Sequence, residues 1–261
     1  MIASIPVILY CGIWGLLLWS AVTRKNIPNA AHYVGLAVAI ASHAGVAFNL
    51  IHTEQGYNFA LAPISSAIFA LINIVVFISG LKKPIKNLFL LLLPLSILTL
   101  IASILFRDSH PNYIEVNTAT GIHIILSVLA YSLLTIATLQ ALLIDYQARR
   151  LKTHHIKTIM GVFPPLQTME TLLFELLWVG FLLLSTAILT GLVFIEDLLA
   201  QKLSHKLVFS LLSWLIYAIL LGGRQLKGWR GNRATRWVLA GFLMLMLAYY
   251  GSKFVIEVLL S

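Results

Sequence analysis

Residues 88–106 read LFLLLLPLSILTLIASILF, a run without a single charged side chain. A helix needs about 20 consecutive apolar residues to cross a hydrocarbon core of ~30 Å. A membrane-spanning strand would instead alternate polar and apolar residues with a period of two, and this run does not alternate. The stretch therefore predicts a transmembrane α-helix.

Similar apolar runs recur along the whole chain of 261 residues, of which 60% are hydrophobic and only 10% charged. A soluble domain usually carries about 25% charged residues, so a mainly water-facing fold is excluded. The sequence predicts an all-α, polytopic transmembrane helical bundle that forms a single integral membrane domain over residues 1–261. The eight predicted spans are residues 4–22, 31–50, 61–81, 87–106, 121–145, 169–194, 205–222 and 237–257.

The loop charges predict the orientation of the bundle. Fourteen of the 18 Lys and Arg residues lie in the connections after the first, third, fifth and seventh spans. Loops rich in Lys and Arg stay in the cytoplasm, so both termini are expected on the outer side. The net charge of +9 therefore indicates orientation rather than nucleic-acid binding. We expect a multi-pass protein of a bacterial inner (cytoplasmic) membrane.

Several chemistries have no motif in this sequence. Cys11 is the single cysteine, which excludes a disulfide framework, a CxxC redox pair and a CxxCH haem-attachment site. The chain has no nucleophile motif, phosphate loop or nucleotide-binding fingerprint. Zinc is disfavoured because the sequence has no His-x-x-x-His pair.

Histidines suggest a binding site near the outer face. His43, His123 and His205 lie towards the outer ends of three predicted spans. A single such histidine is more often structural, but ionisable groups at membrane depth usually face a protein interior, and three together favour a shared site. Two imidazoles can hold a haem iron from both sides. The three histidines are therefore candidate ligands in one haem pocket. Tyr131 would line the pocket, and Lys206 would meet a propionate.

Three other side chains have expected structural roles. Asp145 and Arg149 are four residues apart and are expected to pair on one helix. Glu170 begins a predicted span, where a carboxylate suits the helix dipole. Trp14 is expected to anchor its helix at the membrane interface.

Several stretches carry a family resemblance. They are PLQTME (165–170), GFLLLST (180–186) with Gly191, HK (205–206) leading into LSWLIYAILL (212–221), GWRG (228–231) before LAGF (239–242), and His123 followed by Tyr131. Together they resemble the integral-membrane cytochrome c assembly family of CcsA- and CcmC-like proteins, and most of all its HemX-like branch. Haem-handling members carry a tryptophan-rich outer motif, WGxxWxWD, but residues 191–197 here read GLVFIED.

The resemblance implies a haem-binding or haem-handling membrane protein that works with other cytochrome-assembly proteins. It would bind haem b non-covalently near the outer face, with His123 and His205 as axial ligands and His43 as a relay or alternate ligand. Because no bond to a substrate need be made or broken, we do not expect an enzyme. Two alternatives remain open. The missing tryptophan motif favours a haem-free regulatory or accessory subunit, which would tune haem synthesis or support a membrane transporter. A buried Glu175 would favour an ion or quinone pathway.

Overall fold

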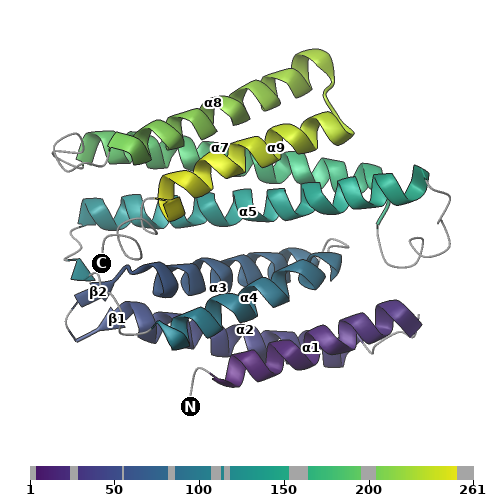
Figure 1. Ribbon diagram of the computed structural model, residues 1–261, viewed down its shortest axis with the longest axis vertical. Coiled ribbons are helices and arrows are strands. Elements are labelled where there is room, and N and C mark those ends of the chain that lie inside the picture. Colours follow the sequence, from purple (N-terminus) through teal and green to yellow (C-terminus); the bar gives the residue numbers. More distant parts are fainter. Residues whose placement is uncertain are drawn as a thin grey trace. The chain divides into compact units, whose positions relative to one another are not determined.

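The computed structural model describes most of the chain. The described residues are 4–23, 29–54, 56–81, 86–106, 113–114, 118–152, 164–194 and 204–251. They contain eight α-helices (Figure 1), which pack into two compact units. The first unit runs to Glu115 and holds α1–α4, and the second begins at Val116 and holds α5, α7, α8 and α9.

The first unit consists of four helices and a small sheet. Its helices are α1 (Ser4–Thr23), α2 (Asn29–Ile51), α3 (Leu61–Gly80) and α4 (Phe89–Leu105), the last preceded by a 3-10 turn (Lys86–Leu88). The strands β1 (His52–Thr53), β2 (Gly56–Asn58) and β3 (Tyr113–Ile114) pair antiparallel in that order. The sheet lies at the ends of α2 and α4, so it joins connections that the sequence places on the outer side.

A proline in α4 leaves a carbonyl that accepts a hydrogen bond from α1. Pro94 has no N–H group, so the carbonyl of Leu90 one turn earlier loses its helical donor. The indole Nε1 of Trp14 donates to this carbonyl at 3.1 Å. In a bilayer core an unsatisfied carbonyl is costly, and the tryptophan replaces the missing bond. Trp14 therefore has a specific partner between helices, beyond the interface role expected for it.

The second unit contains the longest helices. They are α5 (Thr118–Lys152), α7 (Leu166–Phe194), α8 (Ser204–Lys227) and α9 (Gly231–Met246), and α9 continues into a π-helical turn (Leu247–Gly251). Helix α5 packs along most of α7, and α8 and α9 form a hairpin. The hydroxyl of Tyr131 on α5 donates to the carbonyl of Leu245 on α9.

Small residues let these helices approach closely. An added Cβ at Gly180 would lie 2.8 Å from Leu134 Cδ2, and one at Gly241 would lie 2.8 Å from Tyr217 Cζ. Such separations are too short for real carbon atoms, so a larger residue at either position would have to displace its neighbour. This is the close packing by small residues that is usual between transmembrane helices.

The all-α membrane class predicted from the sequence is confirmed. Within the described residues, six helices are long and apolar enough to cross a membrane, while α1 and α4 are shorter apolar helices. Each predicted span overlaps one helix, but several bounds differ by five residues or more. Helix α5 extends to Lys152 instead of residue 145, α8 extends to Lys227 instead of residue 222, and α9 begins at Gly231 instead of residue 237. Hydropathy detects the membrane boundary, whereas α5 continues into polar sequence, where Asp145 and Arg149 form the expected pair at 2.7 Å. The number of spans and their orientation stay predictions.

Candidate functional site

His123 is held against α7 in one defined orientation. Its Nδ1 lies 2.9 Å from the carbonyl oxygen of Ala187 and 3.3 Å from Oγ1 of Thr190. Oγ1 of Thr190 itself donates to the same carbonyl at 3.0 Å. A carbonyl oxygen can only accept, so Nδ1 carries the imidazole proton. The neutral ring then has its lone pair on Nε2.

Glycine makes room for this ring. A Cβ added at Gly191 would lie 2.9 Å from Cε1 of His123 and 3.3 Å from its Nδ1. The imidazole is therefore packed against the backbone of α7, and no other residue type fits there without moving it. His123 is half-buried.

The free nitrogen of His123 is suited to a metal. Within the described residues, both of its hydrogen-bonding contacts are made by Nδ1 and none by Nε2. Histidines that bind metals usually donate the other ring N–H to a carbonyl or carboxylate, which fixes the tautomer and the ring orientation. His123 has this arrangement already, so its donor chemistry fits an axial haem ligand.

The other expected site residues of the second unit are less defined. His205 lies in the first turn of α8, but its side chain is outside the described part of the structure. Lys206 follows it and is half-buried. Tyr131 is buried, with its hydroxyl on α9 and its ring against Phe242, Tyr249 and Tyr250. Its observed contacts are thus packing contacts between α5 and the end of α9.

His43 lies in the first unit and has a different environment. Its side chain is fully buried on α2. Its Nδ1 lies 3.2 Å from the hydroxyl of Tyr10 on α1, and its Nε2 lies 3.1 Å from Oγ of Ser66 on α3. Both nitrogens are occupied by protein, so binding a metal would require one of these bonds to break. The shared site of three histidines stays a prediction.

The part of the chain that is described contains no metal site built from several protein ligands. There, no three His, Cys, Asp or Glu side chains gather closely enough to hold a metal ion. Glu175, whose burial would have favoured an ion or quinone pathway, has an exposed side chain on α7. That observation gives the third alternative no support.

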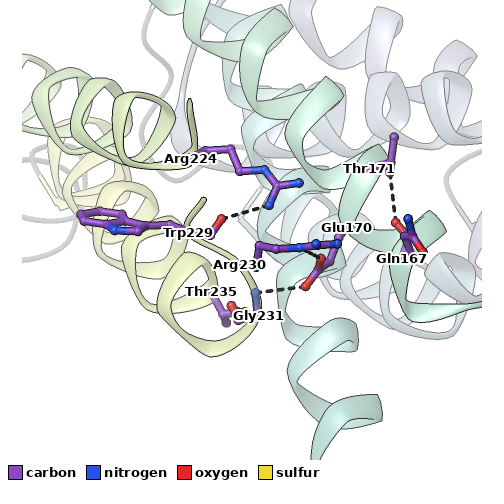
Figure 2. Close-up of polar contacts among 8 residues, drawn as sticks. All are labelled: Gln167, Glu170, Thr171, Arg224, Trp229, Arg230, Gly231 and Thr235. Atoms are coloured by element: carbon purple, nitrogen blue, oxygen red, sulfur yellow. Dashed lines mark hydrogen bonds and ion pairs between the residues drawn. The ribbon is translucent and has the colours of Figure 1, made fainter. Parts of the chain in front are cut away.

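A second cluster joins α7 to the hairpin of α8 and α9 (Figure 2). Oε1 of Glu170 accepts from the backbone N–H of Gly231 at 3.0 Å, and Oε2 accepts from Nε of Arg230 at 3.0 Å. The carboxylate thereby caps the first turn of α9, although the sequence suggested an interaction with the dipole of its own helix α7. Arg224 stacks over the ring of Phe174 at 4.5 Å and donates to the carbonyl of Trp229 at 3.3 Å. Sequence reasoning missed this clamp, and the only available signal was one acidic residue facing a strongly basic loop.

Comparison with known proteins identifies the family. A sequence model described as "Cytochrome C assembly protein" matches residues 9–260. The chain belongs to this family. The resemblance stated from the sequence is therefore confirmed, and it extends well beyond the second half of the chain.

Individual relatives agree with this assignment. The inner membrane protein YpjD of Escherichia coli K12 is 29% identical over 205 residues, covering 77% of this chain and 76% of the relative. An uncharacterised 28.8 kDa protein of Azospirillum brasilense is 33% identical over 189 residues, covering 70% and 69%. The cytochrome c biogenesis protein CcsA of Prochlorococcus marinus is 30% identical over 94 residues, covering 35% and 30%. No solved structure matches the chain.

Proposed function

We propose that this member of the cytochrome c assembly family binds haem b non-covalently near the non-cytoplasmic face, with His123 as an iron ligand. The observation that carries the proposal is the orientation of His123, whose Nδ1 is engaged by Ala187 and whose Nε2 has no partner among the described residues. Haem supplies an iron with two axial positions and two anionic propionates. The protein supplies the ligand, its orientation and an apolar wall.

His205 is our choice for the second axial ligand, with Lys206 beside it for a propionate. Both begin α8, and α7, which orients His123, also packs against α8. His43 is the less suitable ligand because both of its nitrogens are engaged. Tyr131 would border the pocket from α5, the helix that carries His123.

We further propose a location in a bacterial inner membrane, with eight spans, both termini outside, and one membrane domain over the whole chain. The name of the Escherichia coli relative supports the membrane, and the uneven loop charges support the orientation. A reporter enzyme that works only outside the cytoplasm should be active when it is fused after Ser261. A fusion without activity would overturn the topology. Other cytochrome-assembly proteins are the partners we propose from the family.

The test of haem binding is a visible spectrum of the detergent-purified protein, with and without reductant. We expect a Soret band that is weakened by His123→Ala and by His205→Ala. His123→Gln is the sharper variant, because its amide can still donate to Ala187 while it offers iron no imidazole. His52→Ala is the matched control, since His52 also lies near the predicted outer face but outside the proposed site.

Two results would contradict the proposal. A protein that stays colourless after haem is added would favour the haem-free accessory role. A Soret band that is unchanged in the His123 variants would remove this residue as a ligand. His123→Met gives a third reading, because a thioether ligand should shift the reduced spectrum rather than abolish it.

A further inference from the structure

The hairpin between α8 and α9 carries an excess of positive charge. Five cations lie in or beside it, Arg224, Lys227, Arg230, Arg233 and Arg236. Within the described residues, the carboxylate that contacts them is that of Glu170, which pairs with Arg230. Lys227, Arg233 and Arg236 are exposed, and no described contact gives them an acidic partner.

The turn that holds these cations is rigidly built. Gly228 has a φ of +63°, a left-handed conformation that favours glycine and ends α8, and its N–H donates to the carbonyl of Arg224 at 3.1 Å. The next N–H, of Trp229, donates to the carbonyl of Gly223 at 3.2 Å. The indole of Trp229 lies directly on Gly223. A Cβ added at Gly223 would lie 2.4 Å from Cε3 of Trp229.

Aromatic rings extend this platform onto α9. The rings of Trp229 and Trp237 stack with their centroids 5.4 Å apart, and the guanidinium of Arg233 lies 5.5 Å from the Trp229 ring. Leu226, next to Lys227, is 86% exposed. Tryptophan, an exposed leucine and cations in one place are typical of the interface where lipid headgroups meet acyl chains.

We infer that the α8–α9 hairpin is a binding site for the negatively charged headgroup of anionic phospholipids, with Arg233 and Arg236 as its main contacts. The contacts of Glu170, the turn at Gly228 and the packing of Trp229 on Gly223 fix the hairpin before a lipid binds. Little further ordering is therefore required on binding. The aromatic pair and Leu226 distinguish a lipid from a soluble anion, because they offer apolar surface beside the charge. This inference goes beyond the proposed haem function and does not depend on it.

The test compares lipids on the full-length protein in detergent, with native mass spectrometry measuring the affinity for phosphatidylglycerol and for phosphatidylcholine. The wild-type protein should prefer phosphatidylglycerol. Each cation near an anionic surface contributes about 1 kcal/mol, so the double variant Arg233→Gln, Arg236→Gln should bind phosphatidylglycerol roughly 10- to 30-fold more weakly. Phosphatidylcholine binding should not change.

Two further double variants make the test specific. Arg149→Gln with Arg150→Gln removes the same charge from the exposed end of α5 and should keep the preference. The double variant Arg233→Lys, Arg236→Lys retains the charge and should retain the preference for phosphatidylglycerol. Unchanged phosphatidylcholine binding by the Gln variant excludes misfolding as the cause of a loss. An equal loss in both Gln variants would indicate general charge attraction and overturn the inference, as would no loss in either. Soluble glycerol phosphate should compete only weakly for the site. If it competes as strongly as the lipid does, the ligand is a soluble phosphate ester, and the inference is overturned.

Discussion

Removing the carboxylate of Glu170 should loosen α9 from α7. Its bond to the N–H of Gly231 resembles a helix N-cap, and losing such a cap costs about 0.5–2 kcal/mol. The ion pair with Arg230 adds less, about 0.2–1 kcal/mol, because the arginine side chain is 53% exposed and screened by solvent. We therefore expect Glu170→Ala to lower the free energy of unfolding by roughly 1–3 kcal/mol.

The capping bond and the ion pair can be separated. Glu170→Gln keeps an oxygen for Gly231 but loses the charge, so it should cost about 1 kcal/mol or less. In an Arg230→Ala background, Glu170→Ala should still lower the free energy of unfolding by most of its original amount. The reason is that the capping bond to α9 does not depend on Arg230. Gln167→Ala is the matched control, since Gln167 is exposed one turn earlier on α7.

The measurement is unfolding in mixed detergent and SDS micelles, followed by tryptophan fluorescence. A cost of Glu170→Ala below about 0.5 kcal/mol, the size of an ordinary surface substitution, would refute the capping role. A cost that disappears in the Arg230→Ala background would show that the ion pair, and not the cap, supplies the stability.

Three further substitutions have defined outcomes. Gly191→Ala should displace the ring of His123 and weaken the Soret band of haem-loaded protein several-fold without unfolding it, as far-ultraviolet circular dichroism would check. Trp14→Phe should cost about 0.5–1.5 kcal/mol in the same unfolding assay because the carbonyl of Leu90 loses its donor, and a cost near zero would contradict this account. Gly241→Ala should cost about 1–3 kcal/mol, since its methyl group would overlap a buried tyrosine ring of α8, and unchanged stability would show that the two helices can separate freely.

The sequence predicts the helices well because the bilayer imposes a simple rule. A segment that crosses it must be long, apolar and helical, and each of these properties can be read locally. Contacts between adjacent turns of one helix are equally predictable, as Asp145 and Arg149 demonstrate. Both kinds of prediction depend on residues that are close together in the chain.

The partners of polar groups are harder to predict because they come from distant helices. Pro94 predicts that the carbonyl of Leu90 lacks its helical donor. The sequence does not reveal that Trp14, 76 residues away, donates to this carbonyl. Glu170 similarly reaches a backbone N–H some 60 residues further along. In each case the rule that buried polar groups find partners was available, while the identity of the partner required the packing of the helices.

His43 and His123 illustrate why position alone does not define a ligand. His43 and His123 looked alike in the sequence, as imidazoles towards the outer ends of apolar helices. His43 bonds through both nitrogens to hydroxyl groups of neighbouring helices, and so joins α1, α2 and α3. Within the described part of the chain, His123 forms hydrogen bonds only through Nδ1. Its partner Ala187 offers a backbone carbonyl, which can accept a hydrogen bond but cannot donate one. The first arrangement satisfies the ring and stabilises packing, whereas the second fixes the ring and leaves the lone pair of Nε2 without a partner among the described residues. The hydrogen-bond partner of each imidazole, more than its depth in the membrane, therefore distinguishes a structural histidine from a candidate ligand.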